Sequence, residues 1–364
     1  MTMYKRITAI LFMALIMFLT TGTLGKGLLS FQTLSDSTNV PFHERFENFI
    51  SSNFPFSDRF KSFAIRIKRV GGTSMQKGVF IGDDILLENT SPPADLLVKR
   101  NVEKMLEFAN DSAVPVYAMI IPEKCAVKQQ EIPNAEYVQL FNQKDFIEQV
   151  GDAFSGKISM VDAYFPLFLN QDKYIYYRTD PRLTSLGAYY VYQTLASRLN
   201  VRAPDITRYT IQHTSHDFYG ETYDRFPLSD VEPDVISLYH LRSERSVKVK
   251  HNTPEEQIYD TLYPNKENAN PIDVYLGGNS GDIELRANVN SAPNRTLLVF
   301  GDDSMMPILP FLSANFDEIR FIDLSKVDES DIFSVDVFYY DQVLFAYSVE
   351  TFAHTSVPSR IEFS

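Results

Sequence analysis

Six short apolar runs constrain the fold of this chain more than any other feature of its sequence. The runs are VPVYAMIIP (114–122), ISMVDAY (158–164), DVYLGG (273–278), TLLVFGD (296–302), EIRFIDL (318–324) and QVLFAYS (342–348). A continuous apolar run is typical of a strand that is buried on both faces of a parallel sheet. Apolar residues at helical spacing in 94–110, 186–199 and 306–315 predict helices between some of these strands. We therefore predict an α/β fold with a mostly parallel sheet.

Three other segments depart from this alternation. The stretch KGVFIGDDILLE (77–88) predicts a hairpin, with Gly82, Asp83 and Asp84 in its turn. Residues 40–70 place phenylalanines at helical spacing and predict a docking helix. Residues 200–270 are rich in polar, Tyr and Pro residues and contain period-two stretches such as SVKVKH. We interpret them as an inserted polar and β region over the sheet edge.

The first residues have the layout of a signal peptide or signal anchor. Lys5 and Arg6 precede an uncharged apolar run at 7–24, and no Ala-x-Ala cleavage site follows. We favour an uncleaved anchor in the cell membrane, with the remainder outside because the positive flank stays cytoplasmic. Cleavage and secretion are the alternative. The domains expected are an anchor or signal peptide (1–26), a linker with the docking helix (27–75), and one α/β domain (76–364) that carries the insertion at about 200–270.

Charge and composition argue against several kinds of partner. The formal net charge of −13 disfavours nucleic acid and anionic lipid, because phosphate binding requires clustered Lys and Arg. A single cysteine, Cys125, permits no disulfide within the chain. The carboxylate pairs Asp83-Asp84 and Asp302-Asp303 lack the ligand spacing of a calcium loop and have no histidine cluster beside them. We expect neither a metal nor a cofactor.

The loop after the run TLLVFGD holds a candidate nucleophile. In open α/β sheets ligands bind beyond the carboxyl ends of the strands, so the loops there are the first place to look for a site. Ser304 follows Gly301, Asp302 and Asp303, where a strand stops and a helical pattern begins. A serine at such a turn presents its hydroxyl above the sheet and near the positive end of a helix dipole. The alternative is that Asp303 or Ser304 only caps the helix.

Two further loops carry suggestive residues. In LGGNSGD, Gly277 and Gly278 allow close approach of the backbone to a ligand, and Asn279 can donate an amide hydrogen bond. An ordinary turn explains the same residues. In YYRTDPRLTSLGAYYVYQTL, Asp180 lies shortly before a predicted helix with Thr184 or Ser185 as its cap; a purely structural capping loop is the alternative there.

Taken together, these motifs resemble a known family. The pieces are YYRTDPRLTSLGAYYVYQ, FYGETY, EPDVISLY, VYLGGN, DDSMMPILPFL and FDEIRFIDL, with ENFISSNFPFSDRF, GVFIGDDILL and IPEKCAVKQQEIPN upstream. In this order they resemble the bacterial DHHW proteins, exported relatives of the SGNH-type proteins that act in alginate O-acetylation. The resemblance covers nearly everything after about residue 40. It implies a three-layer α/β/α sandwich like that of SGNH hydrolases, a cell-surface polysaccharide as partner, and a membrane-bound O-acyltransferase beside it.

The resemblance also assigns positions to a site. It places the family's serine on Ser304 and its Asp on Asp180, with Asp303 beside the serine. The family's His falls on Arg182 and its Trp on Leu183, and a second family His falls on Ser280. Both histidines of the pattern are therefore absent from this chain. The positions implied for the oxyanion and the substrate are Gly277, Gly278, Asn279, Gly220 and Tyr219.

The loss of both histidines decides between two hypotheses. A serine needs a general base near neutral pH, and a guanidinium stays protonated and has no acceptor. We therefore predict a degenerate site that binds a cell-surface polysaccharide or supports its O-acetylation, with Arg182 paired to Asp180 or binding an anionic sugar group. The alternative is an active O-acetyl esterase or acetyltransferase in which Ser304 uses another base. The candidates for that base are His213, His216, His240, His251 and His354, of which His216 and His354 are the two whose loops could approach the site.

Overall fold

The computed structural model describes residues 75–76, 78–226, 231–242, 246–265, 271–287, 294–328 and 335–361. The chain divides into two compact units, and the described residues other than Phe226 belong to the second, Ser74–Arg225 with Asp230–Ser364. The predicted anchor and docking helix lie outside the described residues. Within the described part of the chain, no helix combines the length and the apolarity needed to cross a membrane.

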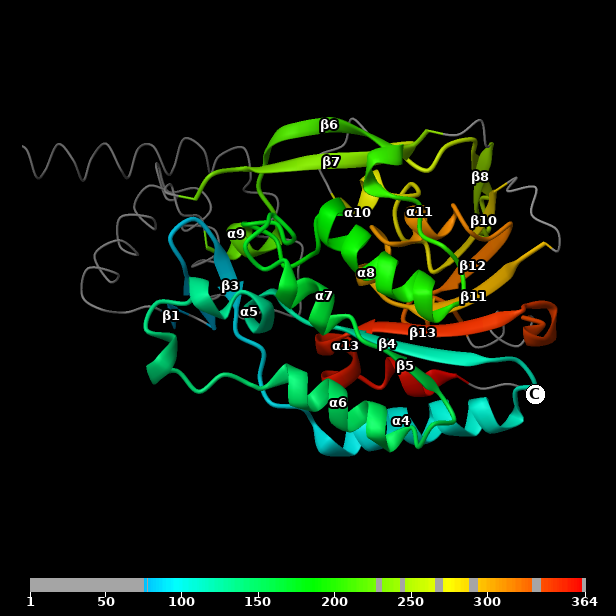
Figure 1. Cartoon of the computed structure of the whole chain (residues 1–364), viewed down its shortest axis with the longest axis horizontal. Coiled ribbons are helices and arrows are strands. Elements are labelled where there is room, and N and C mark those ends of the chain that lie inside the picture. Colours follow the sequence, from blue (N-terminus) through cyan, green and yellow to red (C-terminus); the bar gives the residue numbers. More distant parts are fainter. Residues whose placement is uncertain are drawn as a thin grey trace, which may run out of the picture. The chain divides into compact units, whose positions relative to one another are not determined.

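A sheet of eight strands forms the centre of the second unit (Figure 1). In spatial order the strands are β5 (Ser159–Val161), β4 (Val116–Ile121), β13 (Gln342–Ser348), β11 (Thr296–Gly301), β12 (Glu318–Ile322), β10 (Asp282–Ala287), β8 (Val247–His251) and β9 (Gln257–Tyr259). The five strands from β5 to β12 run parallel, and the last three add antiparallel pairs. The mostly parallel sheet is thus confirmed, and five of the six apolar runs form its parallel half.

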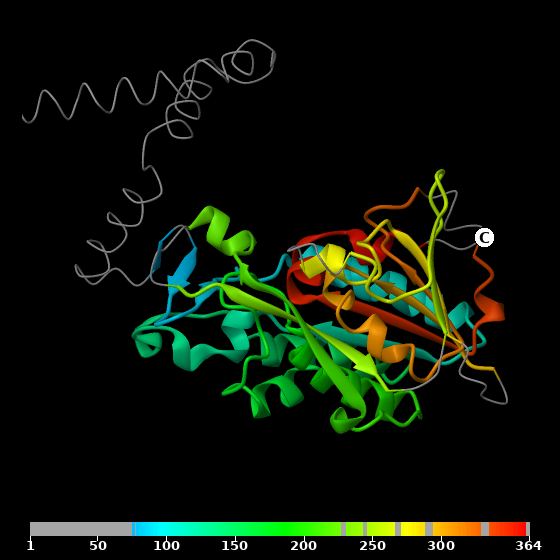
Figure 2. The same ribbon diagram turned by 90° about the horizontal axis from the view of Figure 1, so that it is seen from above.

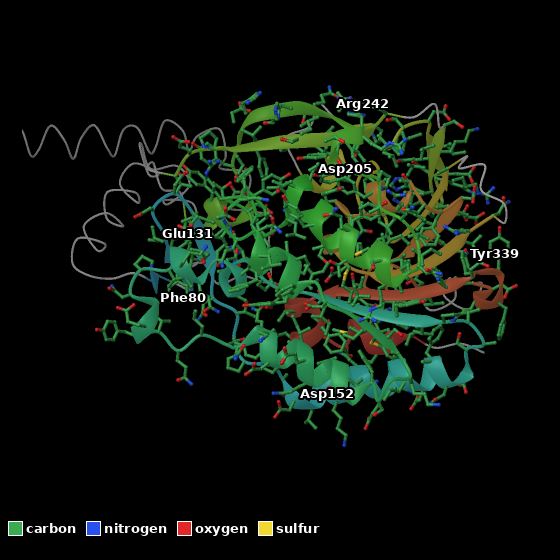
Figure 3. The ribbon with its side chains drawn as sticks, viewed as in Figure 1. Phe80, Glu131, Asp152, Asp205, Arg242 and Tyr339 are labelled. Carbon is green, nitrogen blue, oxygen red and sulfur yellow. The ribbon has the colours of Figure 1, made fainter. Side chains whose placement is uncertain are left out.

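Helices cover both faces of this sheet. Along β13, Leu344 and Ala346 pack with one helical layer, whereas Phe345 and Tyr347 pack with the other, because successive side chains of a strand point to opposite faces. The first layer contains α8 (Ser185–Arg198) and α11 (Leu309–Leu312), and the second contains α4 (Asp95–Asp111), α6 (Gln143–Ala153) and α13 (Val349–His354). Figure 3 shows Asp152 of α6 pointing away from the sheet, in agreement with its exposure. The fold is the three-layer α/β/α sandwich that the resemblance implies.

Two smaller sheets accompany the central one. β1 (Met75–Gln76), β2 (Val79–Ile81) and β3 (Leu86–Glu88) form an antiparallel sheet, which confirms the hairpin expected at 77–88. β6 (Tyr209–Phe218) and β7 (Asp234–Leu241) form a two-stranded ribbon that runs over α8 (Figures 1 and 2). The segment 200–270 therefore builds this ribbon and also supplies β8 and β9 to the antiparallel end of the central sheet.

Short elements complete the chain. The short α-helices are α5 (Lys124–Val127), α7 (Tyr164–Leu169), α9 (Glu221–Arg225) and α10 (Pro271–Val274). The 3-10 turns are η2 (Gln129–Glu131), η3 (Ala135–Tyr137), η4 (Ile206–Arg208), η5 (Asp303–Met305), η6 (Val337–Tyr339) and η7 (Val357–Arg360).

Two predicted elements are wrong in detail. The run DVYLGG does not form a strand: it holds the end of α10 and a turn in which Leu276, Gly277 and Gly278 have φ of 58°, 90° and 97°. Three consecutive left-handed residues are incompatible with a strand. The helix expected at 306–315 is reduced to α11, because Pro307 and Pro310 lack the N–H groups that a longer helix requires.

Candidate functional site

A cleft of about 610 Å³ lies at the carboxyl ends of the parallel strands. Glu123 follows β4, Asp302 and Ser304 follow β11, Asp323 follows β12, and Ser348 ends β13, and all five line the cleft. This is the edge at which open α/β sheets bind their ligands. The segment Pro181–Leu183 and residues of β3 and α9 also line the cleft. The cleft therefore brings the loop after β11 together with the loop that holds Arg182.

Ser304 lies in η5, directly after β11, with its hydroxyl close to a carboxylate. The hydroxyl and the backbone N–H of Ser304 both donate to Oδ1 of Asp302, the latter over 3.0 Å. Oδ2 of Asp302 accepts the N–H and the hydroxyl of Ser348, over 2.9 and 2.8 Å. Asp302, and neither Asp303 nor Ser304, is thus the capping residue of this turn. Its carboxylate joins the ends of β11 and β13 and holds the Ser304 hydroxyl.

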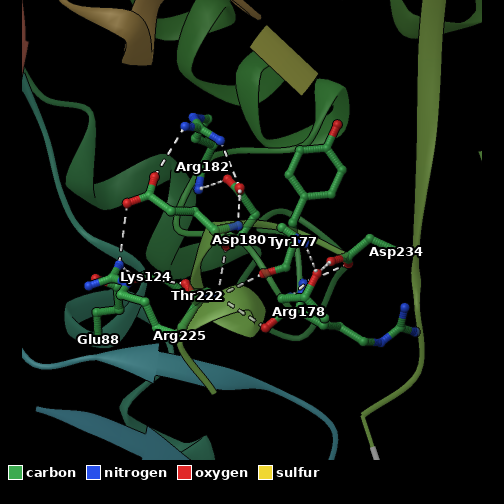
Figure 4. A network of polar contacts seen from close by, with 12 residues as sticks. Glu88, Lys124, Tyr177, Arg178, Asp180, Arg182, Thr222, Arg225 and Asp234 are labelled. Carbon is green, nitrogen blue, oxygen red and sulfur yellow. Dashed lines mark hydrogen bonds and ion pairs between the residues drawn. The ribbon is translucent and has the colours of Figure 1, made fainter. Parts of the chain in front are cut away.

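Asp180 is fully buried behind Arg182. Its Oδ2 accepts hydrogen bonds from Nη1 of Arg182 (2.7 Å) and from the backbone N–H of Glu221 (3.2 Å), and its Oδ1 accepts the N–H of Arg182 (3.1 Å). The second guanidinium nitrogen of Arg182 lies 3.4 Å from the Glu221 carboxylate. The guanidinium thus occupies the space next to Asp180 and is engaged by two carboxylates of its own chain (Figure 4).

A buried lysine and a buried aspartate hold the loop that leads to Asp180 (Figure 4). Nζ of Lys124 donates to the carbonyls of Tyr177, Arg178 and Asp180, over 2.9, 3.2 and 2.8 Å. Burial lowers the pKa of Lys124 to about 8, against the opposing effect of the nearby Asp180 and Asp234 carboxylates. The lysine thus satisfies three carbonyls of one loop.

Asp234, at the start of β7, binds the other side of the same loop. Its carboxylate accepts the backbone N–H groups of Arg178 (2.6 Å) and Thr179 (2.8 Å), together with the hydroxyls of Tyr174 and Thr179. The backbone around Asp180 is therefore fixed from both directions, by a cation on its carbonyls and an anion on its amides. Neither residue was singled out from the sequence, although Lys124 lies in the motif IPEKCAVKQQEIPN and Asp234 in EPDVISLY, because a motif does not show which side chains meet in space.

Gly220 has a packing role beside Asp180. A Cβ added at residue 220 would lie 2.4 Å from Cβ of Asp180 and 2.6 Å from its Oδ2. The N–H of Gly220 also donates to the hydroxyl of Thr179 over 2.9 Å. Glycine is needed here because any side chain would displace Asp180. Gly220 and the adjacent Tyr219, predicted to bind substrate, do not line the cleft as described.

The Gly-Gly-Asn loop is engaged by the chain itself. A Cβ on Gly277 would lie 2.7 Å from the Tyr259 ring, so this glycine permits packing against β9. Nδ2 of Asn279 donates to Oδ1 of Asp303 (2.5 Å) and to Oδ2 of Asp323 (2.9 Å). Because its two amide hydrogens are used in this way, Asn279 has none left to offer an oxyanion in this arrangement. Lys326, which the sequence did not single out, donates to the same oxygen of Asp303 over 2.9 Å.

The described histidines do not line the cleft. His213 and His216 lie together on β6, with ring centroids 5.8 Å apart, and His240 lies on β7. His354 lies 3.2 Å from the carbonyl of Ser91, which lines the cleft, but His354 itself is not a lining residue.

His251 occupies a structural position. Its ring is buried, with Nδ1 2.8 Å from the Ser280 hydroxyl and Nε2 2.7 Å from the Leu276 carbonyl. A histidine thus contacts Ser280, onto which the resemblance places the second family His, but it is tied to the loop rather than facing Ser304. Among the described residues no group of three or more His, Cys, Asp or Glu side chains is arranged to hold a metal ion.

Glu123 is a cleft residue that the sequence analysis missed. It is half-buried, and its Oε1 accepts the backbone N–H of Glu350 at the start of α13, over 3.2 Å. Burial, together with the negative charges of Asp302 and Glu350, raises the pKa of Glu123 to about 8, although the hydrogen bond from the Glu350 N–H acts in the opposite direction. Its position directly after the apolar run 114–122, at the carboxyl end of a central strand, is the signal that could have identified it.

Comparisons with known proteins agree with this architecture. A family model described as "DHHW protein" matches residues 93–322. The structure of a DHHW family protein from Eubacterium siraeum is similar with a TM-score of 0.65 and 17% identity, covering 79% of this chain and 95% of that one. Bacillus cereus PatB1, solved with a sulfonyl adduct, is similar with a TM-score of 0.62 and 16% identity, covering 76% and 96% of the two chains. A search of curated proteins gave no match. Since the family model covers more than half of the sequence, the chain belongs to the DHHW protein family.

Proposed function

We propose that this chain is an exported, membrane-anchored DHHW-family protein that binds a cell-surface polysaccharide, or supports its O-acetylation, through a cleft that has lost its catalytic base. One observation carries the proposal. The residue at the family's His position, Arg182, is a guanidinium bound to Asp180 and Glu221, and it cannot take a proton from Ser304. Without a base, the cleft retains the capacity to bind but not to form an acyl-enzyme efficiently.

The surrounding groups support the same proposal. Asn279 donates its amide hydrogens to Asp303 and Asp323, and the backbone N–H of Ser304 donates to Asp302. Donors aimed at a developing oxyanion contribute strongly to acyl transfer, and here these donors are already occupied. The cleft itself is open enough, at about 610 Å³, to take a sugar unit and part of its neighbours.

The proposed location and partner follow from the sequence and from the resemblance. Residues 7–24, preceded by Lys5 and Arg6, would anchor the chain with its α/β domain outside the membrane. The resemblance to proteins of alginate O-acetylation supports a membrane-bound O-acyltransferase as the proposed partner. The chain would then present or hold the polymer while another protein transfers the acetyl group.

Retention on immobilised polysaccharide tests the binding proposal. Full-length protein in detergent is passed over a panel of bacterial surface polysaccharides, acetylated and deacetylated, beside Ser304→Phe. We expect the bulky ring to block the cleft and to lower retention at least tenfold, because a displaced ligand loses most of its buried contacts. Ser197→Phe, on the exposed surface of α8, is the matched control and should bind like the unmodified chain. Equal retention of Ser304→Phe would place the binding surface elsewhere.

A second function is favoured by the contact between Ser304 and Asp302. The Ser304 hydroxyl donates to a carboxylate, which is an acceptor for its proton, so an O-acetyl esterase or acetyltransferase with a carboxylate base is the competing candidate. His216 and His354, the bases considered first, do not line the cleft.

A sulfonyl probe separates the two functions, and PatB1 is the structural relative solved with such an adduct. We expect intact mass spectrometry to show no phenylmethylsulfonyl adduct on the unmodified chain, because an unactivated serine hydroxyl reacts slowly. A positive-control serine hydrolase is treated in parallel under the same conditions. An adduct that maps to Ser304 and disappears in Ser304→Ala would favour the active enzyme.

A further inference from the structure

The basic side chains of the cleft are already paired. Among the described lining residues three are basic, and each contacts two carboxylates of this chain. Arg182 lies 2.7 Å from Asp180 and 3.4 Å from Glu221. Arg225 lies 2.5 Å from Glu88 and 3.5 Å from Glu221, and Lys326 lies 2.9 Å from Asp303 and 3.9 Å from Asp323. An anionic sugar group could gain one of these cations only by separating it from its partner. The earlier expectation that Arg182 binds an anionic group is therefore not favoured by this geometry.

The balance of charge in the cleft points the same way. Among the described residues that line it, seven are acidic and three are basic. A carboxylate or phosphate of a ligand would meet uncompensated negative charge, and the concave, partly desolvated walls make that repulsion stronger than it is in bulk water. A ligand without anionic groups does not meet this penalty.

Glu123 stands at the strand edge of this cleft in a position suited to donate a hydrogen bond. Its Oε1 is taken by the N–H of Glu350, which leaves Oε2 for the cleft. Three carboxylates surround Glu123: Asp302 after β11, Glu350 of α13 and Glu88 of β3. Two further titratable groups near it are Tyr176 and Cys125. Within the described part of the chain, the charged groups that shift its pKa are all acidic.

The protonated form of Glu123 follows from these neighbours. Burial is the largest cause and raises the pKa to about 8, so near pH 7 the group is mostly a carboxylic acid. A carboxylic acid has one O–H donor, whereas a carboxylate only accepts. A ligand hydroxyl or acetyl oxygen can accept from such a donor without bringing any charge into the cleft.

We propose that the cleft takes a sugar chain free of anionic groups, and that Glu123 enters the complex as a neutral carboxylic acid that donates a hydrogen bond to a ligand oxygen. This inference rests on the proposed polysaccharide-binding function and names the class of polymer. It also makes Glu123 the residue that determines specificity at the strand ends of the cleft.

Two hexamers with the same backbone test the proposal. The probes are the β-1,4-linked glucose hexamer and the same hexamer oxidised to the carboxylate at C6, titrated calorimetrically against full-length protein in detergent. At about pH 6.5 we expect the neutral hexamer to bind about tenfold or more tightly than the carboxylated one. At about pH 9.5 its affinity should fall about tenfold, the size expected when one hydrogen bond is replaced by an unpaired charge.

Variants of Glu123 identify the source of the pH dependence. Glu123→Gln keeps a neutral donor and should bind the neutral hexamer equally at both pH values, within about threefold of the unmodified chain at about pH 6.5. Glu123→Ala should bind it about tenfold more weakly at both. A pH dependence that persists in Glu123→Gln, or preferential binding of the carboxylated hexamer, would overturn the inference but not the proposed function. Binding of neither hexamer, and of no polysaccharide on the panel, would contradict the proposed function.

Thermal unfolding reports the protonation of Glu123 without any ligand. The pKa of about 8 in the folded chain exceeds the ordinary value of 4.5, so the folded chain holds an extra proton between these two values. The stability due to that proton is complete below about pH 4.5 and is lost as the pH rises through about 8. The Tm of Glu123→Gln should therefore rise relative to that of the unmodified chain from about pH 5 to about pH 9. A Tm difference that stays constant with pH contradicts the protonated state, whichever hexamer binds.

Discussion

Asp234→Ala is expected to lower the free energy of unfolding by about 4 kcal/mol. The carboxylate accepts the N–H groups of Arg178 and Thr179 and the hydroxyls of Tyr174 and Thr179, and all of these bonds lie in or at the edge of the core. Each buried donor left without a partner costs about 1 to 3 kcal/mol, and partial entry of water reduces the sum. The substitution also removes the negative charge of Asp234, so the positive charge of the buried Lys124 is less well compensated.

Urea unfolding at neutral pH measures this effect. Asp205→Ala is the matched control, because Asp205 also accepts an N–H and a hydroxyl, both from Thr207, but does so on the exposed surface. Its cost should be much smaller, because water can replace a carboxylate acceptor on the exposed surface. Asp234→Asn, which keeps one acceptor oxygen, should lie between the two. If Asp234→Ala unfolds within about 1 kcal/mol of the unmodified chain, the loop before Asp180 is not held as described.

Arg182→His is expected to raise acetyl-ester hydrolysis about a hundredfold or more above the level of the unmodified chain. Loss of one member of a catalytic triad typically costs about 10⁴ to 10⁶ in turnover, so returning a base can recover part of that loss. Asp180 is fully buried and accepts from residue 182 in the present structure, and it can orient an imidazole by accepting its Nδ1–H. We expect the rate gain to be smaller than the full loss in turnover, because the amide hydrogens of Asn279 are bonded to Asp303 and Asp323 and are not available to an oxyanion.

Initial rates on a chromogenic acetyl ester, with purified full-length protein, measure the gain. Arg182→Gln removes the same positive charge without supplying a base and should show no increase. The double variant Arg182→His with Ser304→Ala should return to the background rate. A correctly folded Arg182→His chain without any gain would mean that the cleft does not hold Asp180 and Ser304 in a reacting geometry, and the degenerate-site proposal would then need a different structural cause.

The sequence by itself determined the layers of this fold. Continuous apolar runs and helical spacing are local properties, so they identified β4, β5, β11, β12 and β13, together with α4 and α8. The same logic failed at 273–278, where an apolar stretch adopts three left-handed residues. It also failed at 306–315, where prolines shorten the helix. The sequence likewise led to Ser304 and Arg182, because a strand-to-helix turn and a family motif are both read along the chain.

Only the tertiary structure decided what surrounds those two residues. Lys124 and Asp234 meet the loop before Asp180 from opposite sides, although 110 residues separate them in sequence (234 minus 124). The pairing of Arg182 with Glu221 and of Arg225 with Glu88, and the placement of Glu123 near Asp302 and Glu350, depend in the same way on segments that are distant in sequence and close in the fold. Electrostatic interactions and burial depend on distance in space, which a local pattern does not contain. The sequence therefore named the candidate nucleophile and the position at which the resemblance expects a base, whereas the fold decided which charges surround them.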